Sequence, residues 1–172
     1  ACCGGNSRSS TLDRLSKIIP WPGRRFPPPG HAVDLGAAGK GAACDAAVEA
    51  YRQAGLQGAV VAVGGSVGLY GEKPGGGPWR VSVRDPWGEG SIGSLALEGG
   101  FVSTSGSYEK CFEQDGVSYH HLLDPKTGYP ADSGLASVTV VSSSGTLSDC
   151  LATVCFVLGY EESLPLLEHF QA

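Results

Sequence analysis

"GSLALEGGFVSTSGSYEKCFEQDGVSYHHLLDP" occupies residues 93–125, and this stretch decides the fold that the sequence predicts. Short apolar and β-branched runs are separated by two glycine-containing turns, "EGG" at 98–100 and "QDG" at 114–116. Runs of this length between turn residues are typical of strands that follow one another in an antiparallel sheet. The stretch therefore predicts consecutive strands, and not the alternation of strand and helix found in dinucleotide-binding folds.

The flanking segments add further strands and place helices at both ends of the strand region. Residues 33–55, "VDLGAAGKGAACDAAVEAYRQAG", predict a short apolar segment, a glycine-rich loop and a helix that ends at Gly55. Residues 58–71, "GAVVAVGGSVGLYG", predict a buried strand, and residues 78–86, "PWRVSVRDP", alternate with the period of a half-buried strand. The remaining predicted elements are one strand and two helices, at 137–143, 145–159 and 161–170.

This order of elements predicts an α+β fold, a mainly antiparallel sheet with packed helices. We expect residues 119–141 to form a strand, a tight turn and a second strand, with "DPKTG" as the turn. Helical spacing also predicts which residues are buried. These are Ala42, Ala43, Ala46, Ala47, Ala50 and Tyr51 in the first helix, and Leu147, Leu151, Val154 and Leu158 in the helix at 145–159.

Composition fits one globular domain behind a tether. The chain has 172 residues, of which 41% are hydrophobic and 17% charged. A net charge of −5 provides no electrostatic footprint for nucleic acid, and no apolar run approaches the roughly 20 residues that span a bilayer. Residues 1–30 predict a polar tether, a short helix and the proline-rich linker "PWPGRRFPPPG", and residues 31–172 predict the folded domain.

The cysteines fall into two groups. "ACCGGNSRSS" at 1–10 resembles the start of a mature bacterial lipoprotein, so we expect a lipid on Cys2 or Cys3 and a location in the periplasm or at the cell surface. No C-x-x-C pair occurs, which argues against a structural zinc site. We expect buried free thiols at the other four cysteines, which are Cys44, Cys111, Cys150 and Cys155.

Three segments carry residues suited to chemistry. "DLGAAGKG" at 34–41 is either a loop whose backbone N–H groups approach a phosphate or a packing loop with Lys40 in solvent; its glycine spacing fits neither a Rossmann fingerprint nor a P-loop. Asp149 and Thr153 are four residues apart on a helix, as oxygen ligands of a hard cation would be, although a helix start also favours an aspartate. His121 precedes the "DPKTG" turn and is a candidate proton acceptor, although the turn also has a purely structural explanation.

Together these blocks resemble the FAD:protein FMN transferase family, the ApbE-type flavin transferases. The resemblance runs from about Val33 to the C-terminus and is most specific in "STSGSYEKCFEQDGVSYHHLLDPKTGYPA" and "SVTVVSSSGTLSDCLATVCFVLG". It implies a T-fold-like α+β architecture for the flavin transferase-like domain at 31–172. It also implies Mg²⁺ and FAD as bound species, and transfer of FMN to a Thr or Ser hydroxyl of an acceptor flavoprotein with release of AMP. The family's acceptor motif is a short Ser/Thr-Gly-Ala-Ser/Thr-like stretch.

The resemblance also assigns roles to single residues. Asp149, Thr153 and the backbone oxygen of Ala37 would hold Mg²⁺. His121 matches the histidine usually assigned to catalysis. The residues expected against FAD are Asp34, Lys40 and Leu123.

Two other functions stay open at this point. Some family members hydrolyse FAD to FMN and AMP, and an FAD pyrophosphatase would use the same residues. Family members are about twice as long, and they carry a segment that covers the isoalloxazine ring where this sequence has "PWPGRRFPPPG" at 20–30. A non-catalytic flavin-binding protein is therefore the third candidate.

Overall fold

The computed structural model describes Ala32 and residues 34–172. Contacts divide the chain between Asp34 and Leu35, and the fold below is that of residues 35–172. The predicted tether, short helix and linker at 1–30, with Cys2 and Cys3, lie outside the described residues. The predicted boundary at residue 31 stays a prediction.

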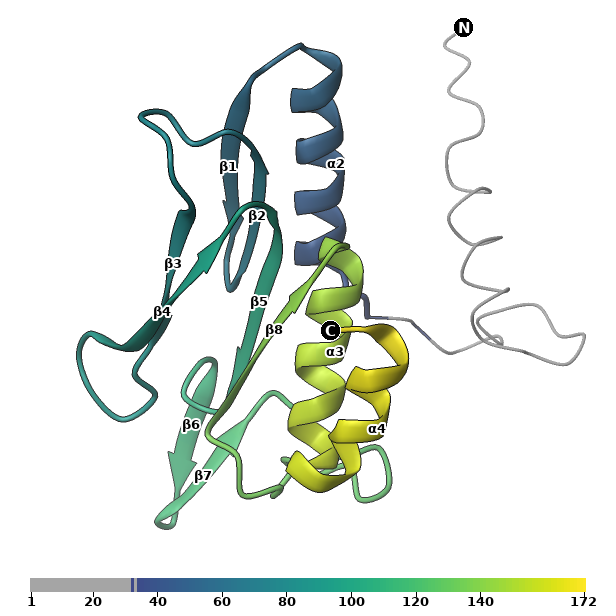
Figure 1. Ribbon diagram of the computed structural model, residues 1–172. Coiled ribbons are helices and arrows are strands. Elements are labelled where there is room, and N and C mark those ends of the chain that lie inside the picture. The colour runs from purple at the N-terminus through teal and green to yellow at the C-terminus, as the bar shows by residue number, and fades with distance from the viewer. Residues whose placement is uncertain (1–31, 33) are drawn as a thin grey trace, which may run out of the picture. The chain divides into compact units, whose positions relative to one another are not determined.

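A four-stranded antiparallel sheet forms the centre of this unit (Figure 1). Its strands lie in the order β1 (Gly58–Val63), β2 (Ser66–Gly71), β5 (Gly100–Gly106) and β8 (Ser137–Ser142). In the register of β2 and β5, Gly68 lies opposite Phe101, and the missing side chain leaves room for the ring. The sheet and its helices confirm the predicted α+β class.

Two smaller antiparallel pairs accompany the sheet. They join β3 (Trp79–Arg84) to β4 (Ser91–Leu97), and β6 (Cys111–Gln114) to β7 (Val117–His120). The β6–β7 turn places Asp115 and Gly116 at φ of 53° and 75°, as a two-residue hairpin turn with matching twist requires. The quoted stretch at 93–125 thus supplies the consecutive strands β4 to β7, as predicted.

The prediction of one hairpin over 119–141 is wrong. Strand β7 pairs with β6 across the "QDG" turn, while β8 pairs with β5 in the central sheet. Between them, the "DPKTG" turn is closed by backbone hydrogen bonds within residues 122–131 and by an isolated bridge from Leu123 to Pro130, and not by a strand pair. A two-residue turn gives β7 a nearby partner, and β8 buries its apolar residues by joining the central strand.

Helices α2 (Gly39–Gln53) and α3 (Gly145–Leu158) lie on one side of the central sheet, one above the other in Figure 1, and meet at their first turns. Helix α2 contacts β1 and β2, and α3 contacts β5 and β8. Helix α4 (Tyr160–Phe170) packs against α3. Ser144 caps α3, because its hydroxyl accepts a hydrogen bond from the N–H of Leu147 at 3.3 Å.

The predicted buried faces of both helices need correction. On α2 the alanines at 42, 43, 46 and 50 are exposed, and the residues buried there are Cys44 and Val48, with Gly41. On α3, Leu151 is buried as predicted, but Val154 and Leu158 are 41% and 38% exposed. Because α3 touches the sheet, α2 and α4, it buries more than one stripe, and small or polar residues fill the closest approaches.

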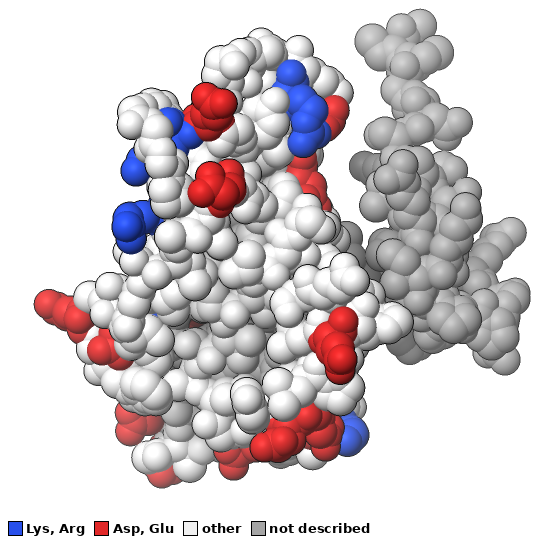
Figure 2. Space-filling model, viewed as in Figure 1, with Lys and Arg blue, Asp and Glu red and all other residues white. Residues whose placement is uncertain are grey.

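The surface carries no basic patch in the face shown in Figure 2, where the lower half has mainly acidic side chains. No helix among the described residues is long and apolar enough to cross a membrane.

Candidate functional site at the crossing of α2 and α3

The first turns of α2 and α3 touch through backbone atoms. A methyl group on Gly41 would overlap the carbonyl oxygen of Gly145, and one on Gly145 would lie 2.5 Å from the carbonyl oxygen of Gly41. Only glycine fits at either position, because both contacts are with backbone atoms that cannot move aside. The close approach brings the start of α2 to the side chain of Asp149 on α3.

Asp149 is a fully buried carboxylate with two partners from α2. Its Oδ2 accepts a hydrogen bond from the Gly41 N–H at 2.9 Å, and its Oδ1 lies 2.8 Å from the Lys40 Nζ. The second contact is an ion pair without hydrogen-bond geometry, so among the described residues Oδ1 accepts no hydrogen bond. A buried carboxylate is stable only when its charge is compensated, and Lys40 supplies that charge.

Lys40 is held in place and is not a freely solvated side chain. Its ammonium donates a hydrogen bond to the Gly36 carbonyl at 3.1 Å, and its side chain is 34% exposed. The next carbonyl, that of Ala37, accepts no backbone hydrogen bond among the described residues, because the Gly41 N–H is directed to Asp149. Of the two interpretations of the 34–41 loop, the packing loop with a solvated lysine is therefore wrong for Lys40.

Asp45 is a residue of this crossing that the sequence analysis missed. Its carboxylate accepts hydrogen bonds from the N–H groups of Gly145 and Thr146 at 2.6 and 2.8 Å, and from the Thr146 hydroxyl at 2.6 Å. It thereby caps the free N–H groups of α3 from a neighbouring helix. The available signal was its position four residues after Gly41, on the same face of α2.

Buried serines fix the rotation of α3 over the sheet. The Ser103 hydroxyl lies 2.9 Å from that of Ser66 and 2.8 Å from that of Ser148, and all three residues are at most 1% exposed. Because Ser148 is held over β5, the neighbouring Asp149 is turned toward α2. One turn later, the Thr153 hydroxyl lies 3.1 Å from that of Ser105.

The predicted catalytic histidine lies on a separate part of the structure. His121 is exposed, and its Nδ1 is 3.1 Å from the Glu109 carbonyl oxygen. The chain beside it is anchored on α3, where His120 meets the Phe156 ring edge-on at 5.5 Å and Leu122 packs in the same cluster. Phe156 is seven residues beyond Asp149, about 10 Å along the helix.

The structure thus unites some predicted residues and leaves others apart. Lys40 and Asp149 are in contact, whereas the partners of His121 and of Asp149 do not overlap. Leu123 is 52% exposed and bridges to Pro130. Asp34 is exposed and lies on the other side of the division at Leu35, so it is not part of the geometry described here.

Comparison with known proteins identifies the family. The family model described as "ApbE family" matches residues 6–172. The chain belongs to the ApbE family. This confirms the resemblance drawn from the sequence.

Curated ApbE relatives share much of the sequence. A protein of Treponema pallidum named "FAD:protein FMN transferase" is 42% identical over 151 residues, and one of Klebsiella pneumoniae with the same name is 40% identical over 141 residues. These matches cover 82% and 81% of this chain but only 42% and 43% of the relatives. The chain therefore spans less than half the length of the relatives it matches.

Solved ApbE structures share the fold. The ApbE protein of Thermotoga maritima superimposes with a TM-score of 0.74 at 39% identity, covering 81% of this chain and 45% of that chain. The flavin transferase ApbE from Vibrio cholerae gives 0.70 at 33% identity, covering 81% and 44%. The ApbE-like architecture predicted from the sequence is thus confirmed.

The donor atoms at the crossing suit a hard cation. The described residues contain no group of three or more His, Cys, Asp and Glu side chains that would hold a metal, so a cation here would use one carboxylate with uncharged oxygens. Among the described residues, Asp149 Oδ1 pairs with Lys40 but accepts no hydrogen bond, and the Ala37 carbonyl accepts no backbone hydrogen bond. The Thr153 hydroxyl, one turn along α3, lies beside that of Ser105. Oxygen donors of these kinds, completed by water and phosphate, are those that Mg²⁺ uses.

Thiolate chemistry is disfavoured beside this site of the ApbE chain. Burial, with a smaller contribution from the Asp149 carboxylate, raises the pKa of Cys150 above its usual 9.0. Burial raises the pKa of Cys44 as well. Both residues are therefore protonated at neutral pH and act as packing groups, not as nucleophiles.

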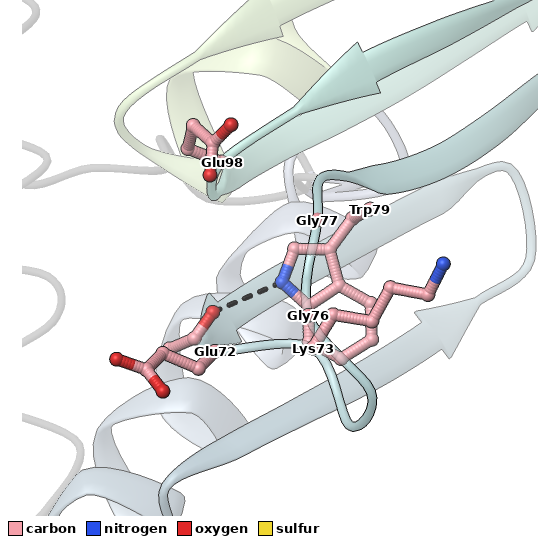
Figure 3. A pocket seen from close by; sticks show the side chains of 7 residues that line it. Glu72, Lys73, Gly76, Gly77, Trp79 and Glu98 are labelled. Carbon is pink, nitrogen blue, oxygen red and sulfur yellow. Dashed lines mark hydrogen bonds between the residues drawn. The ribbon is translucent and has the colours of Figure 1, made fainter.

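A separate cavity of about 330 Å³ lies at the end of β2 (Figure 3). In it the Trp79 indole N–H donates a hydrogen bond to the Gly71 carbonyl at 3.0 Å. None of the predicted site residues of the ApbE chain lines it. Its lining residues are Gly71, Glu72, Lys73, Gly76, Gly77, Trp79 and Glu98.

Proposed function

We propose that this chain takes part in the Mg²⁺-dependent transfer of FMN from FAD to a Thr or Ser hydroxyl of an acceptor protein, with release of AMP. Family membership and the name shared by its curated relatives support flavin transfer. Because the chain covers less than half of those relatives, the activity of the whole protein belongs to the proposal. The observation that carries it is the buried Asp149 carboxylate of α3, which faces the first turn of α2 and has one oxygen that pairs with Lys40 but accepts no hydrogen bond among the described residues.

In this proposal the crossing of α2 and α3 binds the diphosphate end of FAD. Asp149, Thr153 and the Ala37 carbonyl oxygen hold Mg²⁺, which when bound neutralises negative charge on the phosphoryl oxygens. The N-terminus of α2 adds the positive end of its dipole. Lys40 pairs with a phosphate oxygen, and Asp34 and Leu123 contact other parts of FAD.

His121 is proposed as the general base. A backbone carbonyl only accepts hydrogen bonds, so the contact with Glu109 assigns the proton to Nδ1 and leaves the lone pair on Nε2. Nε2 takes the proton of the acceptor hydroxyl while that oxygen bonds to the FMN phosphorus. The bond from this phosphorus to the bridging oxygen then breaks, and AMP leaves with that oxygen.

The β6–β7 hairpin is proposed to receive the acceptor protein. In the part of the chain that the structure describes, each of its strands pairs with a single neighbour and keeps one edge open, and His121 directly follows β7. An extended acceptor segment with a Ser/Thr-Gly-Ala-Ser/Thr-like motif can pair with such an edge and bring its hydroxyl toward His121.

Product analysis tests the function. The chain is incubated with FAD, Mg²⁺ and an acceptor peptide, and the products are followed by chromatography and mass spectrometry. AMP with one FMN in phosphoester linkage to the peptide supports transfer. If AMP and free FMN are formed instead, the protein is an FAD pyrophosphatase. If no AMP is formed, the non-catalytic flavin-binding protein is the function that remains.

Two variants separate the roles within this assay. Asp149→Ala is expected to abolish AMP release, as excess chelator does with the unmutated chain. His121→Ala is expected to slow transfer by about 10²–10⁴, the usual contribution of a general base, while FAD binding stays nearly unchanged. Full activity of Asp149→Ala would show that the metal assignment is wrong.

We also propose that the native protein is exported and tethered to the membrane by a lipid on Cys2 or Cys3. The support is the sequence "ACCGGNSRSS", which lies outside the described residues. Fractionation of the native host, with mass spectrometry of the N-terminal peptide, tests this. A cytoplasmic protein with both cysteines unmodified contradicts it.

A further inference from the structure

The Lys40 ammonium lies among oxygen atoms at the start of α2. It is 2.8 Å from Asp149 Oδ1 and 3.1 Å from the Gly36 carbonyl oxygen. Its aliphatic stem passes the turn between β1 and β2, where a methyl group on Gly64 would lie 3.2 Å from Lys40 Cδ. The ammonium is therefore directed into the crossing of the two helices and not along the surface.

Its surroundings are those of the proposed cation. Asp149 Oδ1 accepts no hydrogen bond among the described residues and pairs with the Lys40 ammonium, and Gly36 precedes Ala37, the proposed carbonyl ligand. A divalent ion bound to Oδ1 and an ammonium 2.8 Å from the same atom would repel each other strongly, because water is excluded from this buried carboxylate. One carboxylate oxygen without other partners cannot hold both at once.

We propose that Lys40 is the resident counter-ion of Asp149, that a divalent cation displaces it, and that the released ammonium then pairs with the diphosphate of the dinucleotide. This inference rests on the proposed function, since it uses the same cation and the same diphosphate. Lysine suits the role because its charge sits on a flexible four-carbon stem, and its exposure of 34% leaves a path out of the crossing.

The exchange has a thermodynamic consequence. Without a diphosphate, a cation must remove Lys40 from Asp149, its one carboxylate partner among the described residues, so the cation binds weakly. With the diphosphate present, the ammonium gains a new anionic partner, and cation and dinucleotide bind cooperatively. This coupling is reciprocal, so the cation raises the affinity for the dinucleotide by the same factor.

Metal binding without dinucleotide is the decisive measurement. Mn²⁺ is titrated into the chain with no FAD present, and the free ion is followed by electron paramagnetic resonance. We expect the neutral variants Lys40→Ala and Lys40→Gln to bind Mn²⁺ at least about tenfold more tightly than the unmutated chain, a typical coupling between sites. Lys40→Arg keeps the charge and is expected to bind Mn²⁺ as weakly as the unmutated chain.

For FAD binding, the neutral Lys40 variants are expected to have the opposite effect, a loss of affinity when Mn²⁺ is present. Quenching of FAD fluorescence is measured with and without Mn²⁺, and circular dichroism establishes that each variant is folded. In the unmutated chain Mn²⁺ is expected to raise FAD affinity about tenfold, and Lys40→Ala and Lys40→Gln are expected to lose most of that increase. A lysine with only a structural role would not tighten the metal and weaken this coupling together.

The outcomes distinguish this inference from the proposed function. Asp149→Asn is the control for metal binding at this carboxylate. If Mn²⁺ binding depends on Asp149 but the neutral Lys40 variants bind the ion no more tightly, the counter-ion inference is wrong and the metal site stands. If no chain binds Mn²⁺, with or without FAD, the metal site of the proposed function is wrong and the inference falls with it.

Discussion

Asp45 offers the sharpest test of how the two helices are held together. Its carboxylate accepts hydrogen bonds from two backbone N–H groups and one hydroxyl at 2.6–2.8 Å, all in the first turn of α3. Losing a side-chain cap costs about 0.5–2 kcal/mol, and a hydrogen bond to a charged group contributes about 1.5–3 kcal/mol. Water replaces part of this at a half-buried position, so we expect Asp45→Ala to lower the free energy of unfolding by about 2–4 kcal/mol.

The assay is thermal unfolding with a matched control on the same helix. Glu49 is also acidic, but it is exposed and pairs only with Arg52 and Gln53 on its own helix. An exposed pair contributes about 0.2–1 kcal/mol. At about 2–4 °C per kcal/mol, we expect Asp45→Ala to lower Tm by roughly 5–15 °C and Glu49→Ala by at most about 4 °C.

The same pair of variants has a functional readout. Separating α2 from α3 moves the Ala37 carbonyl oxygen, a proposed ligand before α2, away from Asp149. With FAD present, where Lys40 no longer competes, Mn²⁺ binding is therefore expected to weaken in Asp45→Ala and to stay unchanged in Glu49→Ala. Asp45→Asn keeps one acceptor oxygen and is expected to fall between Asp45→Ala and the unmutated chain. Equal melting temperatures for Asp45→Ala and Glu49→Ala would refute the argument that Asp45 joins the helices.

Three further predictions concern the glycines of α2 and the cysteines. Gly41→Ala is expected to destabilise the fold and weaken Mn²⁺ binding, because its methyl group overlaps the Gly145 carbonyl. Gly39→Ala has nothing within 4 Å of the added methyl group and is expected to stabilise α2 by up to about 1 kcal/mol. Unfolding curves that rank the two variants the other way contradict the close helix contact. The exposed Cys111 is expected to react with iodoacetamide before the half-buried Cys150, as peptide mapping can measure. Burial raises the pKa of Cys150 above 9.0. From about pH 9 upward the unfolded chain therefore loses this thiol proton before the folded chain does, and the contribution of Cys150 lowers the free energy of unfolding as pH rises. A contribution that raises the free energy of unfolding over that range would contradict the direction of the pKa shift.

The sequence alone predicted most of the elements and selected Lys40 and Asp149, which the structure brings into contact; residues 58–71, predicted as one strand, form the two strands β1 and β2. Alternation and turn residues located the strands between 93 and 125, and helical spacing located α2 and α3. Lys40 and Asp149 were selected as candidates because a glycine-rich loop before a helix and an i, i+4 pair of oxygen ligands are local patterns. Such patterns follow from the steric preferences of a few neighbouring residues, so they can be recognised in the sequence without the fold.

Only the tertiary structure decided how these parts meet. The pairing of β8 with β5, the hydrogen bond from Gly41 to Asp149, and the cap that Asp45 provides join segments far apart, the last two separated by 108 and about 100 residues. Spacing along one helix cannot show that two glycines let a second helix touch it, or that a lysine there compensates a buried carboxylate. Those contacts depend on which faces of α2 and α3 pack against the sheet and against each other, and this is determined by the packing of the whole core.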